Sequence, residues 1–63
     1  MIVKIFGKER KKINFSGKVI DLLKKFGINK EIVVVFRNGK IVTEMDELKN
    51  KDKVEIVRVV FGG

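Results

Sequence analysis

Residues 32–42 read IVVVFRNGKIV, and this stretch decides the fold. The apolar run at 32–36 is rich in β-branched side chains, which is typical of a buried strand. Asn38-Gly39 behind it favours a tight type I′ turn, because both central residues of that turn need positive φ. A short strand at 40–42 should complete a β-hairpin. The rest of the chain must supply the elements that cover this hairpin.

Two further strands are predicted before the hairpin. Residues 1–6 alternate with the period of a strand, and one set of side chains should face the core: Met1, Val3 and Ile5. A second strand is expected at residues 11–15, with the charged stretch 8–10 as the tip between the two. We expect these strands to pair antiparallel.

One helix is predicted after Ser16, which can act as its N-cap. Apolar residues then recur at i, i+3, i+4 and i+7, which places them on one helix face: Val19, Leu22, Leu23 and Phe26. Gly27 is placed to end the helix in the left-handed conformation. A helix of about two to three turns does not persist alone in water, so its apolar face must pack on a sheet.

The C-terminal third of the chain predicts a connection and a last strand. Residues 43–52 are polar except for Met45 and Leu48, which suggests an irregular connection with a turn of helix over one end of the core. Residues 54–60 read as a strand. The chain then ends in Phe61-Gly62-Gly63.

The order of elements is strand, strand, helix, strand, short strand, strand, with the first and last strands able to lie side by side. This is the β-grasp plan of ubiquitin, in the α+β class: a mixed four- to five-stranded sheet with one helix packed across one face. A chain of 63 residues has room for one modest core, so we expect a single domain over 1–63 with a flexible Gly-Gly tail.

The composition narrows the chemistry. The chain has no Cys and no His, so it offers no disulfide, no thiol nucleophile and no thiolate or imidazole metal site. Lys and Arg number 15 against 8 Asp and Glu, and the net charge of +7 favours an acidic partner. No apolar run approaches the roughly 18 residues of a membrane span, so we expect a cytoplasmic protein with no membrane partner.

Two stretches suggest a family. One is VIDLL at residues 19–23, and the other runs from residue 33 through NGKIV at 38–42 to DKVEIVRVVFGG at 52–63. With the N-terminal strand they resemble the sulfur-carrier branch of the ubiquitin-like superfamily, especially the small carrier of bacterial thiamin biosynthesis. The small subunit of molybdopterin synthase shares the fold and tail but is somewhat longer. One departure is Thr43-Glu44, where the thiamin carriers usually have Pro-Arg.

The resemblance implies a carrier with no active site and no bound cofactor. The Gly63 carboxylate would be adenylated with ATP by a ubiquitin-activating-type adenylyltransferase. A sulfur donor such as a persulfide enzyme would then convert it to a thiocarboxylate for thiazole synthase or another acceptor enzyme. Phe61 and Gly62 would form the tail that reaches these enzymes.

Strand alternation also predicts a docking surface. If the first and last strands turn their core residues to the helix, Ile2, Phe6, Val57 and Val59 point the other way and leave an apolar patch. Such a patch could dock partner enzymes, or it could be the ordinary exposed apolar surface of a small sheet or a dimer contact. Arg58 falls on the helix side, so it lies at the rim or follows a bulge.

Two charged clusters have simpler interpretations as solvated turns. A basic group could hold phosphates, although the chain has no Tyr or Trp to stack on bases: Lys8, Arg10, Lys11 and Lys12. An acidic group lacks the spacing of a calcium loop, and we expect no metal there: Glu44, Asp46 and Glu47.

Three functions therefore remain open from the sequence. The first is a sulfur carrier for thiamin or a related cofactor, or for tRNA thiolation. The second is a ubiquitin-like protein modifier that uses the same C-terminus. The third, of another class, is a small basic nucleic-acid-binding module, although nucleic acid is not the favoured partner.

Overall fold

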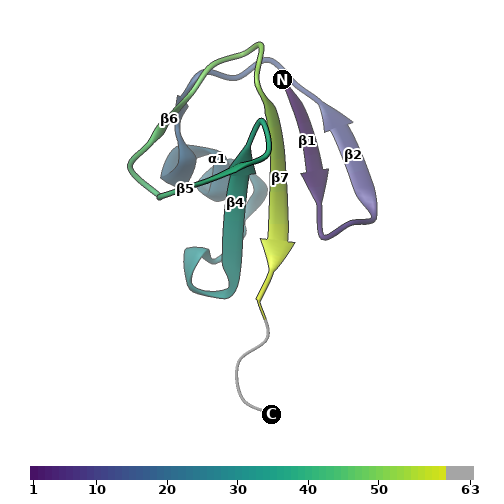
Figure 1. Ribbon diagram of the computed structural model, residues 1–63, viewed down its shortest axis with the longest axis vertical. Coiled ribbons are helices and arrows are strands. Elements are labelled where there is room, and N and C mark those ends of the chain that lie inside the picture. Colours follow the sequence, from purple (N-terminus) through teal and green to yellow (C-terminus); the bar gives the residue numbers. More distant parts are fainter. Residues whose placement is uncertain (60–63) are drawn as a thin grey trace.

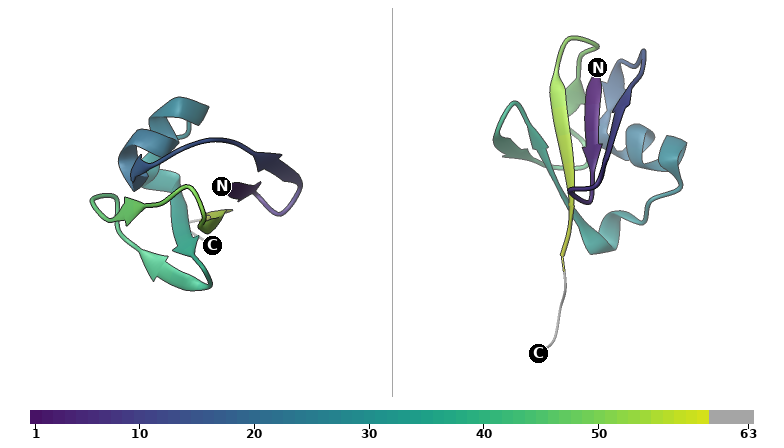
Figure 2. Two further views of the ribbon diagram at one scale, coloured as in Figure 1. Left: turned by 90° about the horizontal axis from the view of Figure 1, so that it is seen from above. Right: turned by 90° about the vertical axis from the view of Figure 1, so that its right-hand side faces the viewer.

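The computed structural model describes residues 1–59, so the tail predicted at Phe61, Gly62 and Gly63 lies outside the described residues. Across these residues a five-stranded sheet has the order β2-β1-β7-β4-β5, and helix α1 covers one of its faces (Figures 1 and 2). The predicted β-grasp is confirmed. The element bounds are β1 Ile2–Ile5, β2 Glu9–Lys12, α1 Val19–Phe26, β4 Val33–Arg37, β5 Lys40–Val42 and β7 Lys53–Arg58.

The sheet is built around β7, which pairs on both sides. It runs parallel to β1, in the register Ile2↔Lys53 to Ile5↔Ile56, and antiparallel to β4. The first and last strands therefore lie side by side, as the sequence predicts. A separate small sheet joins β3 (Gly17–Lys18) to β6 (Glu47–Leu48), and a 3₁₀ turn, η1 (Lys30–Ile32), precedes β4.

The core lies between this sheet and α1. Its buried side chains come from the predicted faces of β1 and α1, from the centre of β4, from β7 and from β6: Met1, Val3, Ile5, Val19, Leu22, Leu23, Val35, Leu48, Val54 and Ile56. Leu22 is 0% exposed, and Phe26 packs against the cluster from its edge. Since α1 has only eight residues, this packing is what stabilises it.

The β4–β5 hairpin forms as predicted. Asn38 has φ 51° and Gly39 has φ 85°, which are the two positive values that a type I′ turn requires. The predicted helix end at Gly27 is also confirmed, with φ 67° and an N–H that donates to the Lys24 carbonyl at 3.1 Å. Local turn chemistry therefore decides both positions.

The second strand spans Glu9–Lys12 and not residues 11–15, so it begins and ends earlier than expected. The turn falls at Phe6-Gly7-Lys8, where Phe6 (φ 54°) and Gly7 (φ 69°) reverse the chain directly after β1. All four residues of β2 are exposed, so no buried face imposes an alternating pattern on this strand. The predicted charged tip is therefore largely strand.

The expected N-cap is wrong. Lys18 occupies the N-cap of α1 without a side-chain hydrogen bond, and Ser16 Oγ instead accepts a hydrogen bond from the Asn50 N–H at 3.2 Å. The first N–H groups of the helix donate to the connection that follows β5: Val19 to the Asp46 carbonyl at 3.0 Å and Ile20 to the Glu44 carbonyl at 2.9 Å. Backbone carbonyls distant in sequence therefore accept the hydrogen bonds that an N-cap side chain would otherwise accept.

The connection after β5 also differs from the prediction. Residues 44–46 form a turn followed by β6, and not a turn of helix. Leu48 is 2% exposed and anchors the connection in the core as predicted, whereas Met45 is 58% exposed and does not. Pairing of β6 with β3 turns Leu48 inward and leaves Met45 on the preceding turn.

A buried carboxylate joins the hairpin to β7. Asp52 is 8% exposed, and its side chain accepts hydrogen bonds from the Lys49 N–H at 2.8 Å and from Asn38 Nδ2 at 3.1 Å. Asn38 in turn accepts from the Lys53 N–H at 2.9 Å. These donors, the Lys49 N–H first, lower the pKa of Asp52, and the nearby charge of Arg37 acts in the same direction.

Replacing Asp52 by Ala should lower the melting temperature at pH 7 by about 5 °C, because hydrogen bonds to a charged group are lost. The pKa of Asp52 is lower in the folded chain, so its contribution is complete above the unfolded value of about 3.9 and is lost as the pH falls through the folded value. Thermal melts should therefore show the gap between Asp52→Ala and the parent chain closing in acid. Glu9→Ala, at an exposed position, is the control. A gap that stays constant from neutral to acid pH would contradict this assignment.

Candidate functional site

The predicted tail follows β7, the strand at the centre of the sheet. Arg58 ends β7, and the Val59 N–H donates to the Ile32 carbonyl at 2.8 Å (Figure 1). On the other side, the Phe6 N–H donates to the Ile56 carbonyl at 2.9 Å. The point where the chain leaves the sheet is therefore fixed between the turn after β1 and the 3₁₀ turn before β4.

The face of the sheet opposite α1 is open, and the strand registers define its residues. They are Ile2, Lys4, Arg10, Lys12, Val34, Phe36, Ile41, Lys53, Glu55 and Val57. The β1–β2 half is cationic, and the β4–β5 half is apolar. Glu55 lies between the halves, since it pairs with Lys4 on one side and with Phe36 on the other.

The structure brings together only some of the residues predicted for docking. Phe6 and Val57 line one hollow at the end of the sheet where β7 finishes, and Val59 is one residue beyond that strand. Ile2 pairs with Lys53 at the opposite end of β7 and lines a separate hollow that also includes Phe36. Ile2 and Val57 therefore lie at opposite ends of the open face, whereas Phe6 lies in the turn after β1 and its side chain packs against the core cluster.

The sequence argument missed part of the apolar half of this face. Ile41 is 66% exposed, against 38% for Ile2, and it pairs with Phe36 across the hairpin. Val34 pairs with Val57 on the same face. A signal was available: the two-residue turn at Asn38-Gly39 fixes the hairpin register, and Val35 facing inward requires its neighbours to face outward. The unbroken apolar run concealed this alternation.

The position of Arg58 is resolved. The pairing of β7 with β4 continues without interruption to Val33↔Arg58, so no bulge precedes it. Arg58 is exposed at the rim, and its guanidinium carbon lies 4.9 Å from the centre of the Phe6 ring. This distance is typical of a cation–π contact.

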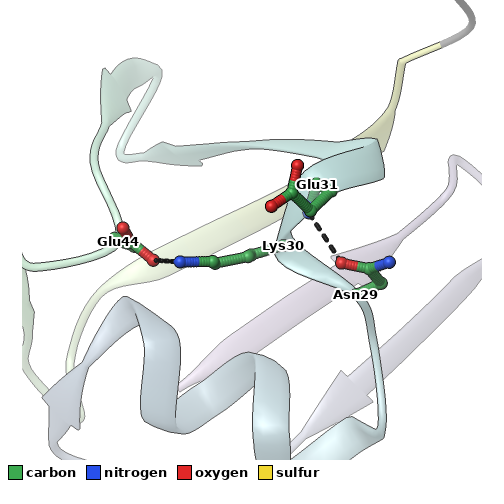
Figure 3. A network of polar contacts seen from close by, with 4 residues as sticks. All are labelled: Asn29, Lys30, Glu31 and Glu44. Carbon is green, nitrogen blue, oxygen red and sulfur yellow. Dashed lines mark hydrogen bonds and ion pairs between the residues drawn. The ribbon is translucent and has the colours of Figure 1, made fainter.

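Thr43 and Glu44, which depart from the pattern of the thiamin carriers, are both engaged in local structure. Glu44 Oε2 lies 2.7 Å from Lys30 Nζ, which raises the pKa of the lysine (Figure 3). The neighbouring Asn29 side chain accepts a hydrogen bond from the Glu31 N–H at 2.9 Å, which caps the 3₁₀ turn (Figure 3). The ion pair thus joins the turn before β4 to the connection after β5.

Two carboxylates of the acidic group at 44–47 make contacts that stabilise the connection after β5. Asp46 Oδ2 accepts hydrogen bonds from the Thr43 N–H at 2.7 Å and from Thr43 Oγ1 at 3.2 Å, while Glu44 pairs with Lys30. In residues 1–59, no group of three or more carboxylates is arranged to hold a metal ion. The same residues include no helix with the length and hydropathy to cross a membrane.

The basic group near the first turn is divided by the sheet. Arg10 and Lys12 lie on the open face, opposite Lys4 and Ile2, whereas Lys11 lies on the other face. Lys11 Nζ is 3.8 Å from a carboxylate oxygen of Glu9. The four cations proposed as a phosphate-binding tip therefore do not form one cluster.

Known proteins show the same architecture. The model of the ThiS family matches residues 3–63. The sulfur carrier protein TtuB of Thermus thermophilus is 32% identical over 57 residues, which cover 87% of this chain and 88% of that protein. The crystal structure of a thiamine biosynthesis protein (ThiS) from Geobacter metallireducens covers 100% of both chains with a TM-score of 0.68 and 24% identity, a likeness of fold. The chain described here belongs to the ThiS family, whose small proteins carry sulfur and are not catalysts.

Proposed function

We propose that this chain carries sulfur as a thiocarboxylate on Gly63 and delivers it for the thiazole of thiamin or for a related cofactor. The observation that carries the proposal is the family match, which continues from the central strand β7 through Gly63. The sulfur-carrier name of the Thermus relative supports the chemistry. The Geobacter protein of the same fold is named for thiamine biosynthesis, which agrees with thiamin as the product.

The chemistry begins with activation, because a carboxylate is a poor electrophile. On a ubiquitin-activating-type adenylyltransferase, an oxygen of the Gly63 carboxylate attacks the α-phosphorus of ATP and pyrophosphate leaves. The terminal sulfur of a persulfide donor then attacks the carbonyl carbon, and AMP leaves. Reduction of the resulting acyl disulfide by a thiol releases the thiocarboxylate. Its sulfur is the nucleophile offered to thiazole synthase or a similar acceptor.

The two terminal glycines suit this chemistry. Glycine has no Cβ and takes extended or positive-φ conformations equally well, so a Gly-Gly tail can enter a narrow channel. A side chain at Gly63 would also crowd the carbonyl carbon that must be attacked. The carrier therefore contributes a slender reactive end and a folded domain that positions it.

The open face of the sheet is the proposed docking surface for the adenylyltransferase and for the sulfur acceptor enzyme. Its exposed apolar part lies on the hairpin, where Ile41 and Phe36 pair, and it continues through Val57 toward the end of β7. Exposed apolar side chains grouped on one face are typical of protein contact sites. This location would hold the exit of the tail close to the bound enzyme.

Intact mass of the protein from its native cell should show a form heavier by the difference between sulfur and oxygen, located on Gly63 by fragmentation. Alkylation of the thiocarboxylate should shift this form and leave the carboxylate form unchanged. If only the carboxylate is found, and the cell's own activating enzyme forms no adenylate with the chain, the proposal is wrong. Isolation of the chain joined to target lysines would instead favour the modifier function.

Gly62→Ala should reduce kcat/KM for adenylation by about tenfold or more while leaving the melting temperature unchanged. The added Cβ restricts the tail inside the enzyme, whereas the core cluster is formed by residues 1–56. Pyrophosphate exchange with the activating enzyme measures the first effect, and thermal melts measure the second. A variant adenylated as fast as the parent chain would show that the channel does not require glycine there.

Ile41→Glu should raise the KM of the carrier in adenylation by about tenfold, because a charge then occupies an apolar contact at the interface. The side chain is 66% exposed, so the fold should tolerate the change. Met45→Glu is a matched control, since Met45 is 58% exposed and lies on the turn before β6, away from the open face. Equal KM values for the two variants would place docking elsewhere.

A further inference from the structure

A hollow lies beside the point where the chain leaves the sheet. It is lined by the turn after β1 and by the second half of β7: Phe6, Gly7, Lys8, Glu55, Val57 and Arg58. The guanidinium of Arg58 lies over the Phe6 ring, 4.9 Å from its centre. Within residues 1–59, Arg58 forms no ion pair, because the pairs found there are Lys11–Glu9 and Lys30–Glu44. The charge of Arg58 is therefore oriented by an aromatic ring and is not neutralised by a described carboxylate.

The ring beneath Arg58 is itself held in place. Phe6 has φ 54° because Phe6 and Gly7 (φ 69°) are the central residues of the hairpin turn between β1 and β2, as Asn38 and Gly39 are in the turn between β4 and β5. The Phe6 N–H donates to the Ile56 carbonyl at 2.9 Å, and the Lys8 N–H donates to the Ile5 carbonyl at 3.1 Å. The ring also packs against the core cluster. The turn and these contacts fix the direction in which the Phe6 ring projects beside Arg58.

We propose that Arg58, oriented by Phe6, binds a carboxylate of the adenylyltransferase at the entrance of the channel that receives the tail. The inference rests on the proposed function and names the group that the activating enzyme must offer. A guanidinium binds a carboxylate through two parallel hydrogen bonds, which fixes direction as well as distance. Because the stack limits the rotation of Arg58 before binding, less entropy is lost when the pair forms.

The anion is an enzyme side chain and not a phosphate of ATP. Gly63 lies five residues beyond Arg58, and an extended chain of that length spans about 17 Å. With the tail extended in the channel, as the proposed function requires, an arginine side chain would not reach the activated carboxylate across this span. Arg58 therefore acts at the start of the tail, where the enzyme surface meets the carrier.

A nucleic-acid backbone fits this hollow less well than a single carboxylate. Phosphate binding generally needs several cations along a track, whereas the lining of this hollow includes the apolar side chains of Phe6 and Val57. Only Lys8 adds a second cation to the described lining. One directed acidic side chain beside an apolar contact matches the lining.

The test compares Arg58→Glu with Lys24→Glu, which makes the same change in net charge on the exposed surface of α1. Pyrophosphate exchange is measured with the adenylyltransferase encoded in the same cell. Arg58→Glu should raise the KM of the carrier about tenfold or more with little change in kcat, and Lys24→Glu should match the parent chain. Added salt should narrow the difference.

Two further variants separate charge from orientation. Arg58→Lys keeps the charge but not the fork of donors, and Phe6→Leu removes the ring while keeping an apolar side chain. Each should raise the KM by about threefold, with thermal melts confirming the fold. If Arg58→Glu and Lys24→Glu give the same KM while the parent chain is adenylated normally, the inference is overturned and the proposed function stands. If the parent chain is not adenylated at all, the proposed function fails and this inference fails with it.

Discussion

The placement of β7 between β1 and β4 is the constraint on which the rest of the structure depends. The strand that ends the described fold must pair parallel to the first strand and antiparallel to the hairpin. Val54 and Ile56 then meet α1, and the intervening side chains are turned to the open face. The same pairing fixes where the chain leaves the sheet. One set of backbone hydrogen bonds thus determines the core, the open face and the point where the chain leaves the sheet.

This arrangement divides the work of the molecule between two faces. The helix side holds the packed aliphatic core. Within residues 1–59, the buried carboxylate of Asp52 accepts a hydrogen bond on each of its two oxygens. The open side is divided between the cations of β1–β2 and the apolar surface of β4–β5, with Glu55 at the boundary. In the function proposed above, the helix side gives the carrier rigidity and the open side is the surface that partner enzymes contact. The ion pair of Lys30 with Glu44 joins the turn before β4 to the connection after β5.

Much of the fold could be predicted because most elements bury one face, which imposes a period on the sequence. The same reason explains the errors. β2 is exposed throughout, so its sequence shows no hydrophobic period and its bounds were predicted wrongly. The first N–H groups of α1 bond to carbonyls distant in sequence, so the prediction of Ser16 as the N-cap was wrong. Met45 and Leu48 are both apolar residues in a polar segment, and only the position of β6 decides that Leu48 is buried and Met45 exposed. For the site, the sequence predicted the terminal Gly63 but not Phe36 and Ile41, because their place on the open face follows from the register of β4 with β5 and β7.

The position of β7 also affects how the protein is made. Ribosomes synthesise a chain from its N-terminus, so the strand at the centre of the sheet emerges after every element that it holds together. Until it emerges, β1 and β4 have no common neighbour and the core lacks Val54 and Ile56. A product that stops short of β7 cannot complete the sheet, and its exposed apolar surface would mark it for proteolysis. Completion of the fold thus checks that translation has passed through β7, beyond which the proposed function places the sulfur-bearing glycine.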